Sequence, residues 1–85
     1  MFYVYALKSL DHNFINVGMT ENLEERIIRH NKGYNKSTKR FAPFKLIYHE
    51  ICNSGAEARI REKYLKSSTG KRFLYSLLDA PTENE

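Results

Sequence analysis

The sequence predicts an α+β fold, in which a small antiparallel three-stranded sheet is flanked by about three helices. Two apolar runs, 2–7 and 14–19, are rich in aromatic and β-branched residues and are separated by a short polar run. Two amphipathic segments with helix-capping signals follow, and a third apolar run, 45–51, separates them. A hairpin, a helix, a strand and further helices therefore follow one another along the chain.

The first expected element is a β-hairpin. The polar run 11–13 (Asp-His-Asn) supplies turn residues between the two apolar runs. Because side chains alternate across a strand, Tyr3 and Tyr5 share one face of the first strand. Gly18, near the end of the second strand, has no β-carbon. It would either let a backbone or a phosphate approach closely or simply form a bend.

The second expected element is a helix capped by Asn22 or by the threonine two residues earlier. Glu25 completes a capping box with Asn22, and Gly33 stands where a left-handed residue commonly ends a helix. Arg26 and His30 are one turn apart, so they project from one face, at the border of the apolar stripe. Taken alone, such a pair is most often a solvated helix edge.

A polar, basic loop at 34–43 follows the helix. Tyr34 and Phe41 lie among its cations, where their rings would either stack on unpaired bases or anchor the loop to the core. The next strand, 45–51, is dense in apolar residues. We expect it to be central or half buried in the sheet.

The second helix begins at Ser54, since Glu57 completes a capping box three residues later. It extends to about Lys66, and Glu62 lies beside its inner face. A carboxylate there needs a cation or a metal, because an unpaired buried charge is costly. From the helix alone, Lys66 at i+4 is the expected partner of Glu62.

A last helix, 71–78, closes the core, so we expect a single domain over 1–78 and a polar, disordered tail at 79–85. The only cysteine, Cys52, excludes an internal disulfide and a cysteine-rich zinc site, which indicates a reducing compartment. No leader-like segment is visible, and no apolar run approaches the roughly 20 residues that span a bilayer. We therefore expect a cytoplasmic protein with no membrane partner.

Positive charge is concentrated in two segments of this chain of net charge +4. Residues 26–45 carry seven cations and no carboxylate, and residues 59–72 carry six cations opposed only by Glu62. This distribution favours a polyanionic partner, although an ordinary solvated surface would also account for it. The candidate nucleic-acid contacts are Arg29, Tyr34, Lys36, Lys39, Arg40, Lys45, Lys66, Lys71 and Arg72.

The hairpin and first helix resemble the GIY-YIG nuclease family, whose two name triplets lie on adjacent hairpin strands. Here the triplets are Tyr3-Val4-Tyr5 and Asn16-Val17-Gly18. Segments 37–50 and 55–74 are similar to the third strand and the glutamate-bearing helix of the small, single-domain bacterial branch. The resemblance covers nearly the whole chain, from 2 to 78, and implies the family's fold and phosphodiester hydrolysis.

Two departures from the family pattern affect the expected chemistry. Tyr3 replaces the glycine that opens the first triplet, a mild change that small members often show. Asn16 replaces the tyrosine that opens the second triplet. Family mechanisms use that phenol beside the attacking water, and an amide cannot take a proton. Asn16 therefore bears on catalysis and not on the fold.

The resemblance also implies a role for each matching position. Arg26 would donate to the non-bridging phosphate oxygens, and either Tyr5 or His30 would be the general base. Glu62 would anchor one Mg²⁺ or Mn²⁺ ion, and Asn16 would make at most a hydrogen bond to water or phosphate. We therefore expect a metal-dependent endonuclease or nickase that acts on DNA, with branched or damaged DNA in repair or recombination as the expected setting.

Two other function classes remain open on the sequence. Asn16 motivates a nucleic-acid-binding module that kept the nuclease fold and lost or weakened the chemistry. A small protein-interaction domain with an incidental positive surface is the third possibility. A domain of this size grips few base pairs, so specificity would come from a homodimer or a partner protein. The sequence does not decide between DNA and RNA.

Overall fold

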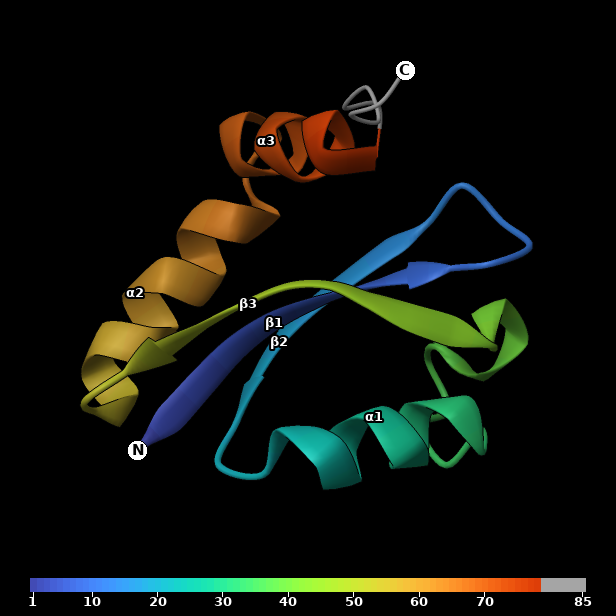
Figure 1. The fold of residues 1–85 in the computed structure, drawn as a ribbon, viewed down its shortest axis with the longest axis horizontal. Coiled ribbons are helices and arrows are strands. Elements are labelled where there is room, and N and C mark those ends of the chain that lie inside the picture. Colours follow the sequence, from blue (N-terminus) through green and yellow to red (C-terminus); the bar gives the residue numbers. More distant parts are fainter. Residues whose placement is uncertain (79–85) are drawn as a thin grey trace, which may run out of the picture.

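The computed structural model describes residues 1–78, which form one three-stranded sheet and three α-helices (Figure 1). The predicted tail, 79–85, lies outside the described residues. The α+β prediction is confirmed. The elements are β1 (Phe2–Ser9), β2 (Ile15–Thr20), α1 (Leu23–Asn31), the 3₁₀ turn η1 (Lys39–Phe41), β3 (Phe44–Cys52), α2 (Gly55–Lys66) and α3 (Ser68–Leu78).

The strand order is β2-β1-β3, and both pairs are antiparallel. The third strand is therefore an edge strand and not the central one, so of the two alternatives expected for it only half burial is correct. Its apolar residues are unevenly buried: Phe44 and Cys52 are buried, Ile47 is partly buried, and Leu46 and Ile51 are exposed. The central strand is β1, whose residues Val4 to Leu7 are all buried.

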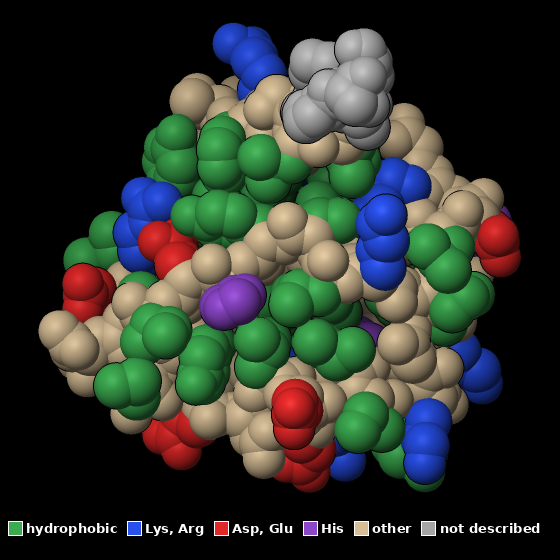
Figure 2. Space-filling view, viewed as in Figure 1, with side chains coloured by type: hydrophobic (Ala, Val, Ile, Leu, Met, Phe, Trp, Pro, Cys, Tyr) green, Lys and Arg blue, Asp and Glu red, His purple; other side chains and the backbone are tan. Residues whose placement is uncertain are grey.

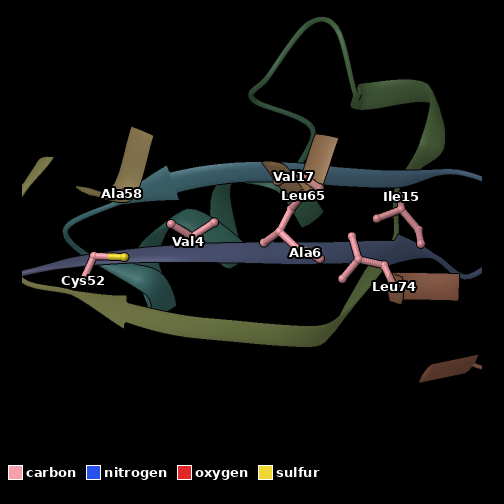
Figure 3. Packing of buried hydrophobic residues seen from close by; sticks show 8 residues of the cluster. All are labelled: Val4, Ala6, Ile15, Val17, Cys52, Ala58, Leu65 and Leu74. Atoms are coloured by element: carbon pink, nitrogen blue, oxygen red, sulfur yellow. The ribbon is translucent and has the colours of Figure 1, made fainter. Parts of the chain in front are cut away.

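The sheet separates two apolar layers because side chains alternate across each strand. On one face, side chains of α2 and α3 pack against side chains of the strands, and Figure 3 draws residues from both sides of this contact. On the other face, Tyr5, Leu7 and Phe44 form a smaller cluster with residues of α1, and Figure 1 shows α1 on the side of the sheet away from α3. The residues labelled in Figure 3 are Val4, Ala6, Ile15, Val17, Cys52, Ala58, Leu65 and Leu74.

Both predicted helix caps are present. Asn22 Oδ1 accepts from the Glu25 amide at 3.1 Å, and Ser54 Oγ accepts from the Glu57 amide at 3.1 Å. Gly33 has φ +77°, the left-handed conformation expected after α1. These local signals fix where α1 and α2 begin and where α1 ends.

The last helix begins three residues earlier than predicted, at Ser68. Gly70, in its first turn, packs against the end of α2, where a β-carbon would collide with the backbone of Tyr64 and Leu65. The two helices can approach this closely only because residue 70 has no side chain.

The face seen in Figure 2 is apolar in its middle, with Lys and Arg side chains around its margin. Exposed residues of β3 on this molecule include Leu46 and Ile51. Positive charge therefore does not collect at the centre of this face. Among residues 1–78, no helix has the length and apolar character needed to cross a bilayer.

Candidate active site around Tyr5 and His30

A tyrosine and a histidine from different elements meet under α1. Tyr5 projects from the central strand β1 toward α1, and its Oη lies 3.3 Å from Nε2 of His30 in the last turn of α1. Each residue is only 2% exposed. The rings meet edge to face, with centroids 6.1 Å apart. The fold thus joins two candidate general bases into one hydrogen-bonded pair.

The other neighbours of His30 favour one tautomer. Asn16 Nδ2 lies 3.5 Å from His30 Nε2, and an amide nitrogen can only donate. This contact suits the tautomer in which Nε2 accepts and Nδ1–H donates to Thr38 Oγ1 at 3.0 Å. In that tautomer the Tyr5 hydroxyl donates to His30 Nε2. A neutral His30 is thus oriented to receive the Tyr5 proton.

The guanidinium of Arg26 lies within interaction range of both groups. Burial raises the pKa of the Tyr5 phenol, and the charge and hydrogen bonding of Arg26 lower it in part. Burial and the Arg26 charge both lower the pKa of His30 below its usual 6.5. At neutral pH the site therefore contains a protonated phenol, a neutral imidazole and a fixed positive charge.

Glu62 on α2 completes the charged surroundings of Tyr5. The negative charge of Glu62 contributes to raising the Tyr5 pKa. Glu62 Oε2 also binds Lys66 Nζ at 3.2 Å. The Glu62 side chain is 16% exposed and that of Lys66 is 55% exposed. The intrahelical bridge considered from the sequence therefore exists, and the Glu62 side chain stays partly exposed to solvent.

Gly18 leaves room for the side chain of Tyr5. Tyr5 and Gly18 are cross-strand partners, and a β-carbon at residue 18 would lie 2.5 Å from the Tyr5 oxygen. The phenol therefore occupies the space that any larger residue would fill. The sequence allowed for close approach of a backbone or a phosphate at Gly18, but the group that approaches is the Tyr5 side chain.

The donor set suits a metal ion held mostly by water. Within residues 1–78 there is no cluster of three or more His, Cys, Asp or Glu side chains that would enclose an ion. Glu62 offers one hard, partly exposed carboxylate. Magnesium keeps several waters and often takes one or two protein carboxylates plus substrate phosphate, so this single donor fits it.

A cleft of about 500 Å³ runs along α1 next to this site. Arg26 and His30 line it, so it opens beside the group that shifts the Tyr5 pKa. Its lining combines the cations Arg26, Arg29 and Lys36 with polar side chains and one carboxylate, Glu25, and the cations suit a phosphate group. Its lining residues are Thr20, Asn22, Glu25, Arg26, Arg29, His30, Tyr34, Asn35 and Lys36.

The predicted nucleic-acid contacts divide into two groups. Arg29, Tyr34 and Lys36 line the cleft with Arg26. The other predicted cations lie elsewhere: Lys39 and Arg40 on η1, Lys45 on β3, Lys66 on α2, and Lys71 and Arg72 on α3. Lys71 donates to the Ile15 carbonyl at 3.4 Å, at the start of β2.

Several residues that hold the site together were not predicted from the sequence. Thr38 is 4% exposed and fixes His30, yet a threonine within a polar loop carries no distinguishing signal. Asn31 Oδ1 accepts from the Phe44 amide at 2.6 Å, and Ser9 Oγ donates to the Phe41 carbonyl at 2.6 Å. These bonds join residues 13 and 32 positions apart, which no local pattern reveals.

A family model described as the GIY-YIG catalytic domain matches residues 1–76. The chain is 44% identical over 75 residues to a UPF0213 protein of Clostridium perfringens, covering 87% of this chain and 80% of that protein. It is 42% identical over 73 residues to a UPF0213 protein of Staphylococcus haemolyticus, covering 85% of this chain and 88% of that protein.

The fold is similar to a solved one. The solution NMR structure of a UPF0213 protein from Bacillus halodurans superposes with a TM-score of 0.55 at 34% identity. The match covers 99% of this chain and 93% of that chain. Both the three-stranded sheet and its flanking helices are therefore shared with an experimentally determined structure.

Proposed function

This chain belongs to the GIY-YIG catalytic domain family, and from that premise we propose that it is an endonuclease or nickase that hydrolyses phosphodiester bonds in DNA with one divalent metal ion. The family resemblance drawn from the sequence is confirmed by these matches. Branched or damaged DNA is the proposed substrate, and a second copy of the chain or a partner protein would supply further specificity.

The observation that carries the proposal is the hydrogen-bonded Tyr5–His30 pair, in which the charges of Arg26 and Glu62 both shift the Tyr5 pKa. Three elements, β1, α1 and α2, contribute these four side chains. Hydrolysis needs a proton acceptor, a positive group for the phosphate and a site for a cation. In this proposal the Tyr5–His30 pair accepts the proton and the Arg26 guanidinium binds the phosphate. The Glu62 carboxylate would hold the cation.

His30 acts through Tyr5 in this proposal. Both ring nitrogens of His30 are engaged by hydrogen bonds, to Tyr5 and to Thr38, so in this proposal the attacking water contacts Tyr5 and not His30. The Tyr5 oxygen takes a proton from the water while the Tyr5 proton passes to His30 Nε2. The lowered pKa of His30 keeps Nε2 free to receive it at neutral pH. Asn16 keeps its donor on Nε2 and takes no proton.

Arg26 and Glu62 have separate tasks. The planar, permanently charged guanidinium of Arg26 lines the open cleft and binds the non-bridging phosphate oxygens. Glu62 would hold the metal ion through its carboxylate, with water and phosphate as the other ligands. When bound, a divalent ion supplies Lewis-acid stabilisation of the charge that develops on the phosphate and the leaving oxygen.

A nucleic-acid-binding module without turnover is the second candidate. Asn16 lacks the phenol that the family places there, and Lys66 engages Glu62. This candidate predicts salt-dependent binding of DNA and no cleavage with any metal. The test described next separates the two candidates.

Cleavage of supercoiled plasmid and of branched duplexes in Mg²⁺ or Mn²⁺ tests the proposal. Glu62→Gln removes the carboxylate charge with little change of shape, and we expect it to abolish cleavage. Glu50→Gln is the matched control, because Glu50 is also half buried and pairs with Arg61 at 3.0 Å, but on β3. Cleavage that persists in Glu62→Gln would reject the metal site, and absence of cleavage by the wild-type protein would favour the binding module.

A further inference from the structure

Tyr34 presents an open aromatic ring to the cleft beside α1. The residue is 62% exposed and lines the same cleft as Arg26. The guanidinium carbon of Arg29 lies 5.5 Å from the centre of the Tyr34 ring, so a cation braces the ring. A large exposed aromatic residue beside cations needs an explanation other than core packing.

Local hydrogen bonds fix the loop that carries this ring. The Tyr34 amide donates to the Arg29 carbonyl at 3.1 Å. Asn35 Oδ1 accepts from the Ser37 amide at 3.1 Å, and Thr38 binds His30. The loop is therefore tied to the end of α1 on both sides of Tyr34, which sets the ring beside the cleft before any ligand arrives.

The other ring of this loop has a different task. Phe41 stacks on Phe14 with centroids 4.0 Å apart and an interplanar angle of 14°. Arg40 covers it, with its guanidinium carbon 4.9 Å from the ring centre. Phe41 therefore anchors the loop to the core, as one of the two sequence interpretations allowed. Of the two rings in this loop, Tyr34 is therefore the one that is exposed and able to contact a ligand.

We propose that the cleft takes one unpaired nucleotide, whose base stacks on Tyr34 while its phosphate binds Arg26. A base within a duplex is already stacked on both faces and cannot receive another ring, whereas an unpaired base can. Arg29 and Lys36 supply further phosphate contacts, and Glu25 supplies an acceptor for base amino groups. A cleft of about 500 Å³ is in the range of small-ligand sites.

The substrate class that follows is single-stranded nucleic acid, or a duplex with an unpaired nucleotide beside the cut. This inference rests on the proposed nuclease function, because Arg26 serves both the cleft and the Tyr5 site. It adds a selectivity for the base, which the proposed roles of Tyr5 and His30 in proton transfer do not include.

Equilibrium binding without divalent metal tests the inference apart from catalysis. The probes are a short single-stranded DNA, the same strand in RNA, a blunt duplex and the duplex with a single-stranded extension. Each single-stranded probe carries a fluorescent adenine analogue whose emission falls when it stacks. We expect tighter binding and quenching with the unpaired probes, and the DNA and RNA arms identify the sugar that the cleft accepts.

Three variants locate the effect. Tyr34→Ala should weaken single-strand binding between about 5-fold and 100-fold and remove the quenching, with blunt-duplex affinity unchanged. Tyr34→Phe keeps the ring and should behave as wild type. Tyr64→Ala is the matched control, because Tyr64 is 40% exposed and carries Arg61 at 5.0 Å, but on α2 and away from the cleft.

The possible failures are distinguishable. If Tyr34→Ala binds every probe as the wild-type protein does, or weakens single strand and duplex equally, the stacking inference is wrong. Cleavage abolished by Glu62→Gln would still support the nuclease proposal in that case. If instead Tyr34-dependent selectivity is present and the wild-type protein cuts nothing, the inference stands and hydrolysis is rejected.

Discussion

The phenol of Tyr5 lies over Gly18 of the neighbouring strand, in the space that a β-carbon at residue 18 would take. Such a carbon would be 2.5 Å from the Tyr5 oxygen and 2.7 Å from Cζ. The two residues are also register partners in the β1–β2 pair. The last residue of the first triplet and the last residue of the second are thus one packing unit, which sets the Tyr5 hydroxyl against His30.

Gly18→Ala should therefore displace Tyr5 and break its bond to His30. We expect a loss of stability of about 1–3 kcal/mol from overpacking. We expect nuclease activity to fall by about 100-fold or more, the usual contribution of acid–base catalysis. Urea unfolding and plasmid cleavage measure the two effects.

Gly55→Ala is the control for that variant. A β-carbon at residue 55 would lie 3.3 Å from Cζ of Phe2, away from the Tyr5 site. Its stability should change little and its cleavage rate should match that of the wild-type protein. Equal loss of activity in both glycine variants would contradict the packing unit.

Thr38→Val should damage the site through His30. The change keeps the shape of a residue that is 4% exposed and removes the acceptor for His30 Nδ1–H. A buried donor left without a partner costs about 1–3 kcal/mol of stability. Because the imidazole then loses its fixed tautomer and orientation, cleavage should fall about tenfold or more.

Thr38→Ser restores a hydroxyl and should recover most of both losses. Thr69→Val, at an exposed position of α3, should change neither. A Thr38→Val protein that cleaves as fast as wild type would show that Thr38 does not position His30.

The free energy of unfolding should decrease at acidic pH because of His30. Burial and Arg26 hold its pKa below 6.5 in the folded state, so the unfolded chain takes up the proton first. The free energy of unfolding is therefore unaffected by this group above about pH 6.5 and decreases as the pH falls from there toward the folded-state pKa. Urea unfolding between about pH 5 and pH 8 measures the slope.

His30→Gln should show a shallower slope over the same range. His49→Gln, which changes an exposed histidine on β3, should keep the wild-type slope. The polar and charged groups around His30 are Tyr5, Asn16, Thr38 and Arg26, and none of them is a carboxylate. Identical slopes in the wild-type and His30→Gln proteins would contradict the lowered pKa.

Lys66→Met should ease metal binding at Glu62. Lys66 holds Glu62 Oε2 at 3.2 Å, and an i,i+4 pair of this kind is worth about 0.3–0.5 kcal/mol. Its removal should lower the metal concentration that gives half-maximal cleavage by about twofold. Lys66 is also a predicted phosphate contact, so DNA affinity is measured separately.

Lys63→Met, on the same helix and also exposed, is the control for the change of net charge. It should leave the metal dependence at the wild-type value. An unchanged or higher metal requirement in Lys66→Met would mean that Glu62 does not bind the ion.

Local sequence alone determined the elements of this protein. The hairpin, the caps at Asn22 and Ser54 and the left-handed Gly33 depend on residues within a few positions of one another, so their patterns could be read without the fold. The ordered residues Tyr5, Arg26, His30 and Glu62 were likewise visible as candidates. Their chemical roles stay predictions until the variants are measured.

Tertiary structure decided what those candidates contact. The edge position of β3, the Gly18–Tyr5 packing and the Thr38–His30 bond join residues that lie far apart in the chain. Such contacts are set by how sheet and helices pack, and a side chain carries no mark of a partner that packing brings to it. For the same reason only the fold distinguishes Tyr34, which is exposed beside the cleft, from Phe41, which stacks on Phe14.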